Sequence, residues 1–147
     1  MSGYNNILVA IDFSKTTGQV IERAMEISSR YDTNLTLMHV VEYSPPMEFA
    51  GDLGMTSDWT IDENDLIKGS KKSLQKFAEK YKLSSSPQIV HLGTPKYEIT
   101  QYAEEGSYDL IIVGSHGRHG LGRLLGSTAD GILHHAHCDV LAVRIKE

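Results

Sequence analysis

The sequence predicts a doubly wound α/β fold in a single domain, residues 1–147, with a five-stranded parallel sheet and helices on both faces. Short apolar runs rich in β-branched residues alternate along the chain with longer segments of helical periodicity. The composition, 40% hydrophobic and 22% charged residues, supplies one core. Right-handed crossovers then leave the flavodoxin-like and the nucleotide-binding doubly wound strand orders as candidates.

The first strand is predicted at residues 7–11, where the continuous apolar run ILVAI indicates burial on both faces. A helix over 15–31 follows, and residues 34–41 (NLTLMHVV) form the second strand. The helix prediction rests on side chains at helical spacing, namely Val20, Ile21, Ala24, Met25 and Ser28.

Residues 42–60 interrupt this alternation with two prolines, two glycines and no sustained periodicity, so we expect a long loop or a partly mobile flap there. A longer helix is predicted over 61–82 and a short third strand over 88–92. Thr94 is expected to cap the next helix, which has Pro95 at its first position and runs to about residue 105.

The last part of the chain adds a fourth strand at 109–113, a glycine-rich loop at 114–126 and a helix at 127–135. Residues 140–145 (VLAVRI) form the fifth strand, at an expected edge of the sheet. An apolar edge strand invites aggregation unless another chain pairs with it. Dimerisation through this strand is therefore expected on physical grounds.

Charge and cysteine content exclude several classes of protein. The net charge of −5 argues against general nucleic-acid binding, which depends on Lys and Arg neutralising phosphates. No apolar run is long enough to span a bilayer, and no secretory signal is seen at the N-terminus, so we expect no membrane attachment. A lone cysteine, Cys138, fits a reducing compartment, and we expect a cytoplasmic protein.

The loop after the fourth strand is the most unusual segment. Residues 114–128 (GSHGRHGLGRLLGST) contain five glycines and two arginines but no acidic residue. Glycines let backbone N–H groups converge on a bound group, and a helix starting at Ser127 adds the positive end of its dipole. Because ligands of doubly wound sheets bind outside the carboxyl ends of the strands, the loops after strands one and four are the expected site.

Three better-known motifs do not fit this loop. It has no Gly-Lys-Ser/Thr, so it is not a Walker P-loop, and a dinucleotide fingerprint would follow strand one. The run GSHG at 114–117 also differs from the G-x-S-x-G elbow of hydrolases.

Four segments together resemble the universal stress protein family over essentially the whole chain: GSHGR at 114–118, Gly126-Ser127, CDVLAV at 138–143 and ILVAIDFS at 7–14. The resemblance implies the adenine nucleotide alpha hydrolase-like fold with strand order 3-2-1-4-5. It also implies a homodimer paired through the last strand, whose residues are Val140, Leu141, Ala142, Val143, Arg144 and Ile145.

The nucleotide-binding branch of that family implies bound ATP, with Mg²⁺ as a candidate accompanying ion. Its pattern is Gly, two residues, Gly, nine residues, Gly, then Ser or Thr; here eight residues separate Gly117 from Gly126. The resemblance places Asp12 beside the adenosine, with Ala10 and Ile11 lining that pocket and the backbone of Val40 at the adenine edge. Around the phosphates it places Gly114, His116, Gly117, Gly126, Ser127 and Thr128. Charge alone adds Arg118 and Arg123.

Simpler structural roles stay open for several of these residues. Asp12 can belong to the turn before the first helix, and Ser127 with Asp130 has the form of a capping box. The arginines can be solvated loop charges. Histidines 134, 135 and 137 lack a cysteine or carboxylate partner at metal-ligand spacing, so no metal site is predicted.

The function expected from these observations is a dimeric, ATP-binding regulatory or sensor domain of the stress response. Two alternatives stay open, a nucleotide-free dimeric scaffold that acts through protein contacts and, with less support, slow ATP hydrolysis. No residue resembles a tuned general base, so we do not class the chain as an enzyme.

Overall fold

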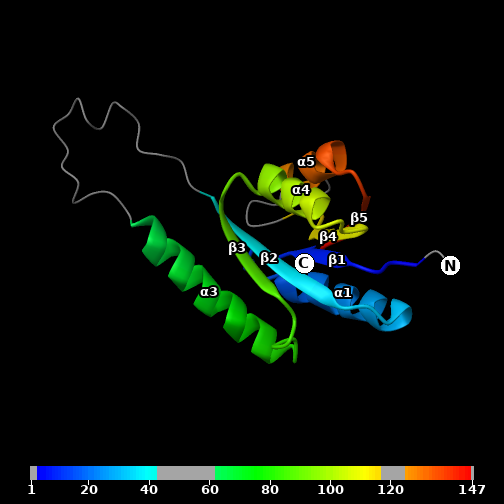
Figure 1. Ribbon diagram of the computed structural model, residues 1–147, viewed down its shortest axis with the longest axis horizontal. Coiled ribbons are helices and arrows are strands. Elements are labelled where there is room, and N and C mark those ends of the chain that lie inside the picture. The colour runs from blue at the N-terminus through cyan, green and yellow to red at the C-terminus, as the bar shows by residue number, and fades with distance from the viewer. Residues whose placement is uncertain (1–2, 43–61, 117–124, 147) are drawn as a thin grey trace.

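The computed structural model describes residues 3–42, 62–116 and 125–146 (Figure 1). Strands and helices alternate along this part of the chain from the first strand to the last. Their bounds are β1 Ile7–Ala10, α1 Thr17–Tyr31, β2 Leu35–Glu42, α3 Glu63–Lys80, β3 Gln88–Gly93, α4 Pro95–Glu105, β4 Leu110–Gly114, α5 Ser127–His135 and β5 Asp139–Val143.

The five strands form one parallel sheet in the order β3-β2-β1-β4-β5, which confirms the predicted topology. Register is continuous across its middle, where Leu8 of β1 pairs with Thr36 of β2 and with Ile111 of β4. The direction of winding reverses between β2 and β4 on either side of β1. This places a topological switch point at the carboxyl end of β1.

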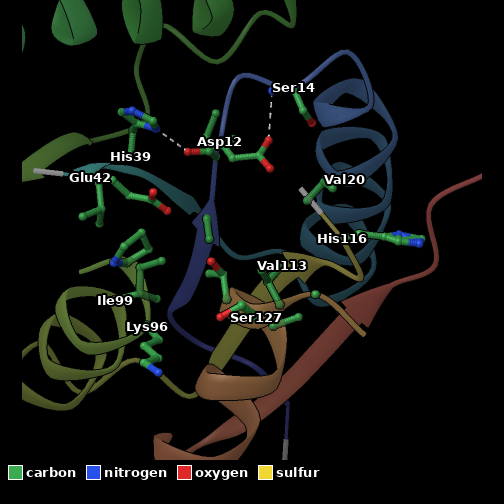
Figure 2. Close-up of a pocket in the computed structure, with 18 of the residues that line it drawn as sticks. Asp12, Ser14, Val20, His39, Glu42, Lys96, Ile99, Val113, His116 and Ser127 are labelled. Carbon is green, nitrogen blue, oxygen red and sulfur yellow. Dashed lines mark hydrogen bonds between the residues drawn. The ribbon is translucent and has the colours of Figure 1, made fainter. Parts of the chain in front are cut away.

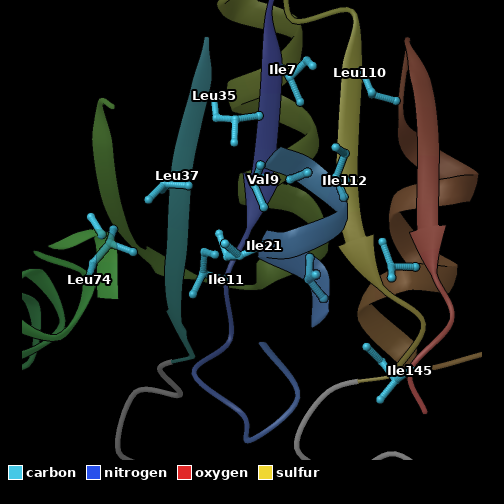
Figure 3. Packing of buried hydrophobic residues seen from close by; sticks show 14 residues of the cluster. Ile7, Val9, Ile11, Ile21, Leu35, Leu37, Leu74, Leu110, Ile112 and Ile145 are labelled. Atoms are coloured by element: carbon cyan, nitrogen blue, oxygen red, sulfur yellow. The ribbon is translucent and has the colours of Figure 1, made fainter. Parts of the chain in front are cut away.

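Helices cover both faces of the sheet, with α1 and α3 on one side and α4 and α5 on the other (Figure 1). Alternate residues of β1 therefore enter two cores. Val9 packs with the α1 and α3 side chains Ile21 and Leu74, and Leu8 packs with Ile99 and Ile132 of α4 and α5. Figure 3 shows the first of these cores.

Local sequence sets the helix ends. The side chain of Asp62 accepts a hydrogen bond of 2.9 Å from the backbone N–H of Asn64 and so caps α3. Helix α4 starts at Pro95, as predicted, although the Thr94 side chain makes no capping bond. Asp32, in the left-handed conformation with φ 49°, ends α1.

Helix α5 spans the predicted residues 127–135, but one alternative role and one strand end need correction. The N-cap of α5 is Gly126, so Ser127 is the first helical residue and does not form a capping box with Asp130. Strand β5 ends at Val143, and Arg144 and Ile145 lie beyond it. Ile145 nevertheless packs into the core on the α1 side of the sheet.

The predicted loop at residues 42–60 lies outside the described residues except for Glu42, which ends β2. In the parts of the chain that the structure describes, no helix is both long and apolar enough to cross a membrane.

Candidate functional site

A cleft of about 600 Å³ opens at the carboxyl ends of the central strands (Figure 2). Its walls come from the ends of β1 and β2, the turn into α4, and the two described ends of the loop between β4 and α5. The predicted nucleotide-binding residues that the structure describes all line it: Ala10, Ile11, Asp12, Val40, Gly114, His116, Gly126, Ser127 and Thr128. Gly117, Arg118 and Arg123 lie outside the described residues.

Asp12 holds the turn between β1 and α1. Its Oδ1 atom accepts hydrogen bonds from the backbone N–H of Ser14 at 3.0 Å and from the hydroxyl of Thr17 at 2.9 Å. Within the described residues its Oδ2 atom makes no hydrogen bond, and Asp12 borders the cleft. The turn role is therefore real, and it leaves one carboxylate oxygen available to a hydroxyl group in the cleft.

Ser115 joins the ends of the glycine-rich loop to β5, a role that sequence reasoning missed. Its backbone N–H donates to Val143 at 2.8 Å, and its carbonyl accepts from the N–H of Gly126 at 2.6 Å. The Ser115 hydroxyl also accepts from the N–H of Ile145 at 3.0 Å. The chain thus enters and leaves residues 117–124 at fixed, adjacent points.

Gly126 lies at a close approach where the two loop ends meet. A Cβ atom at this position would lie 3.0 Å from the Cα of His116 and 3.2 Å from the carbonyl oxygen of Ser115. Both neighbours are backbone atoms, which cannot rotate away. This close approach brings the start of α5, with its free N–H groups, to the cleft.

The ring of His116 points away from the centre of the cleft, unlike the side chains of Asp12 and Ser127 (Figure 2). Its Nδ1 atom lies 3.5 Å from the Ser115 hydroxyl.

One wall of the cleft was not predicted. Gly93, Thr94, Pro95, Lys96 and Ile99 line it from the turn after β3 and the first turns of α4. Gly93 has φ 148°, a conformation that side chains rarely adopt. Thr94-Pro95 could have indicated this wall, because the pair marks a helix start after a parallel strand. Such a helix start lies at the same edge of the sheet as the other ligand-binding loops.

Two charged residues border the cleft near this wall. Glu42 is exposed at the end of β2 and forms no ion pair within the described residues. The aliphatic part of Lys96 lies against Gly131 of α5, and its Nζ atom is 5.2 Å from the centre of the Tyr97 ring.

Histidines at the end of α5 pair with separate carboxylates. His134 lies 3.4 Å from Asp130, and His137 lies 3.3 Å from Glu104. Over the ranges that the structure describes, no three His, Cys, Asp or Glu side chains gather as a metal site would need.

A comparison with protein families matches residues 3–144 to the universal stress protein family. The chain belongs to that family. Universal stress protein A homolog 2 of Coxiella burnetii is 41% identical over 99% of both chains.

Solved structures share the fold of this universal stress protein. UspA from Lactobacillus plantarum has a TM-score of 0.74 and 29% identity over 99% of this chain and 100% of its own. A universal stress protein solved in complex with cAMP has a TM-score of 0.64 and 21% identity, over 97% of this chain and 98% of its own.

Proposed function

We propose that the cleft binds an adenine nucleotide, with ATP as the first candidate, and that the protein is a cytoplasmic regulatory domain of the stress response. The observation that carries this proposal is the division of the Asp12 carboxylate, in which Oδ1 holds the turn and Oδ2 stays available beside the cleft. The cleft volume of about 600 Å³ is within the range of roughly 300–1,000 Å³ found for small-molecule sites. The universal stress protein solved in complex with cAMP supports an adenine nucleotide as the ligand of this fold.

Each part of the nucleotide has a matching part of the cleft. The base lies against Ala10, Ile11 and the main chain of Val40, and Asp12 accepts from a ribose hydroxyl. The phosphates face the start of α5, where backbone N–H groups and the helix dipole favour negative charge. The residues assigned to them are Gly114, His116, Gly117, Arg118, Arg123, Gly126, Ser127 and Thr128.

Ser127→Glu tests this assignment while sparing the fold. Ser127 is exposed at the first position of α5, where an acidic side chain is stabilised by the positive end of the helix dipole. A carboxylate there would repel a phosphate, so we expect ATP affinity to fall by more than about tenfold while the unfolding midpoint stays the same or rises. Ser127→Ala is the matched control and should retain most of the affinity. Equal ATP affinity in the Glu and Ala variants would remove the α5 terminus from the binding site.

Mg²⁺ would accompany ATP in this proposal, bound through the phosphates. ATP titrations with and without magnesium test this part. The same titrations test the first alternative, because a nucleotide-free scaffold would bind no ATP. Analysis of the nucleotide recovered after incubation tests the second, slow hydrolysis.

We also propose that a second copy pairs along β5. Among the strands that the structure describes, β5 pairs with β4 alone and forms the edge of the sheet, where another strand could add. Val140, Leu141 and Ala142 are half-buried, whereas Val143 and Ile145 already pack in the core. The interface would therefore use the side chains of the first three residues, the exposed Arg144, and the main chain of the others.

The mass in solution tests the dimer. We expect sedimentation equilibrium to give twice the chain mass for the wild-type protein and a lower average mass for Val140→Lys, because lysine on an edge strand opposes pairing. Lys146→Glu changes a charge just beyond the strand and serves as the control. A monomeric wild-type protein would exclude the dimer without affecting the nucleotide proposal.

A further inference from the structure

The turn between β1 and α1 contains a strained residue. Phe13 has φ 58°, in the left-handed region that bulky side chains avoid. Its two neighbours in the chain, Asp12 and Ser14, both line the cleft. Such a conformation persists only where the surrounding structure holds it, so the contacts of the Phe13 ring determine how Asp12 is presented.

On one side, the Phe13 ring packs on His39 of β2. The ring centres are 4.3 Å apart, with an interplanar angle of 41°. His39 is itself fixed to β1, because its Nδ1 atom is 2.6 Å from the carbonyl oxygen of Ile11 (Figure 2). A carbonyl only accepts hydrogen bonds, so Nδ1 is the donor.

On the other side, the Phe13 ring meets α3. The centres of Phe13 and Phe77 are 6.5 Å apart in an edge-to-face arrangement, and Phe77 is followed by Tyr81 at 4.9 Å. The Tyr81 hydroxyl reaches Gly18 in the first turn of α1, where a Cβ atom would be only 2.5 Å away. A row of aromatic rings therefore runs from the edge of the cleft to the C-terminal part of α3.

This row lies at the end of α3 that is attached to the domain, where the helix packs on β3 and β2. The fully buried residues of the helix are Leu74 and Ala78, both in its C-terminal half. Phe77 and Tyr81 pack beside them against the same core. Residues 62–65 at the start of α3 are exposed, and Leu66 and Ile67 are only half-buried. The docked end of α3 is thus the end that touches the Phe13 turn.

We propose that Phe13 and Phe77 are positioning residues, through which the docking of α3 holds Asp12 in the shape that binds the ligand. The part of this inference that concerns affinity rests on the proposed nucleotide function. Coupling is reciprocal, so a ligand that fixes the Asp12 turn also favours docking of the C-terminal half of α3. The outward surface of α3 would then report whether the cleft is occupied.

Amide exchange in the nucleotide-free protein tests the positioning directly. The Ser14 N–H donates to Asp12 and the Thr17 N–H donates to Ser14, so both report on the turn. We expect Phe77→Leu to speed exchange of these two amides by about fivefold or more relative to the amide of Ile111 in the core. Phe77→Tyr keeps the ring and should restore wild-type rates. Unchanged rates in Phe77→Leu would overturn the proposal.

Tyr31→Leu is the matched control. It removes a ring from an edge contact of 5.2 Å with Tyr4, and neither of these two residues lines the cleft. We expect the Ser14 and Thr17 amides of this variant to exchange as in the wild-type protein. Faster exchange in both variants would indicate general loosening and would also overturn the proposal.

ATP titration tests the consequence for binding. We expect Phe77→Leu to weaken ATP by about fivefold or more, with Phe77→Tyr and Tyr31→Leu close to wild type. Phe13→Gly removes the backbone strain along with the ring, so affinity falls if the ring stack matters and holds if only the backbone conformation does. Equal ATP affinity in Phe77→Leu and wild type would contradict the coupling. A wild-type protein that binds no ATP would instead contradict the proposed function, and the amide-exchange experiment would then decide whether Phe77 positions Asp12.

Discussion

The buried hydroxyl of Thr17 donates a 2.9 Å hydrogen bond to Oδ1 of Asp12, across the turn that connects β1 to α1. The same oxygen accepts from the backbone N–H of Ser14. One half of the carboxylate is thus committed to the local fold and the other half is available to the cleft. The two functions of Asp12 are separable by mutation because they use different oxygens.

Asp12→Asn should retain the turn and weaken nucleotide binding. The amide oxygen can replace Oδ1 as an acceptor, whereas the NH₂ group in place of Oδ2 can no longer accept from a ribose hydroxyl. We expect ATP affinity to fall by about tenfold or more, the loss typical of a hydrogen bond to a charged group. Calorimetric titration measures the affinity, and a urea melt within about 1 kcal/mol of wild type would show that the turn survives.

Thr17→Val is the complementary change. It removes the hydroxyl that donates to Oδ1 and leaves the carboxylate in place. Because valine keeps the side-chain shape in a buried position, we expect a stability loss of about 1–2 kcal/mol with a smaller effect on ATP than Asp12→Asn. A larger effect on affinity from Thr17→Val would mean that Asp12 serves the turn alone.

Gly126→Ala should destabilise the protein and impair the cleft. The added Cβ would meet the backbone of Ser115 and His116 at 3.2 and 3.0 Å, so the loop ends must shift slightly to accept it. We expect a loss of about 1–3 kcal/mol in the free energy of unfolding, together with weaker ATP binding.

Gly69→Ala provides the matched comparison for that experiment. Gly69 lies inside α3, and among the described residues no atom outside the adjoining helix backbone is within 4 Å of a Cβ at that position. Alanine is favoured over glycine in a helix by about 1 kcal/mol, so urea denaturation should show a gain of that size. Similar effects of the two substitutions would indicate that the backbone of Ser115 and His116 leaves room for a Cβ atom at position 126.

Gly131→Ala tests the contact between α4 and α5. Its Cβ would lie 2.8 Å from the Cβ of Lys96, an atom fixed to the α4 backbone. The cost of moving the helices apart opposes the helix-forming advantage of alanine. We expect a net loss of about 1 kcal/mol in urea denaturation. A gain equal to that of Gly69→Ala would show that the helices adjust freely.

The contribution of Tyr4 to the stability of the folded protein should be lost at alkaline pH. Its hydroxyl donates to Asp139 at 2.8 Å, and this hydrogen bond, with some burial and the nearby negative charge, raises the pKa of Tyr4 above 10.0. A pKa raised on folding means that the contribution to stability is present below the unfolded value of 10.0 and is lost as pH rises through the folded value.

The comparison with Tyr4→Phe isolates this contribution. Burial also raises the pKa of Tyr102, and that effect is common to both proteins. We expect the wild-type advantage in urea midpoint to be constant from about pH 8 to 9.5 and to shrink above about pH 10. A difference that stays constant up to pH of about 11 would contradict a functioning Tyr4–Asp139 bond.

Most of the helices and strands could be predicted because each depends on the hydrophobic pattern of a short stretch of sequence. The runs at residues 7–11 and 110–113 are apolar throughout, as is typical of strands buried on both faces, and both lie in central strands. Pro95 likewise marked the start of α4 correctly. The strand order came from family resemblance, because local pattern alone leaves several doubly wound orders.

The details that were missed depend on contacts between distant residues. Helix α5 starts at Ser127 as predicted, but its N-cap is Gly126, whose backbone N–H donates to the distant carbonyl of Ser115. The left-handed turn at Phe13 depends on rings from β2 and α3, about which residues 12–14 carry no information. The α4 wall was recognisable in principle from Thr94-Pro95, once the sheet edge was considered as a whole.

The most direct test of the central claim is ATP titration calorimetry on protein that has been unfolded, freed of small molecules and refolded, with wild type and Asp12→Asn measured side by side. The account predicts saturable binding of one ATP per chain to the wild-type protein and an affinity lower by about tenfold or more in the variant. Absence of binding heat at several temperatures, with and without magnesium, would contradict nucleotide binding and favour the scaffold function.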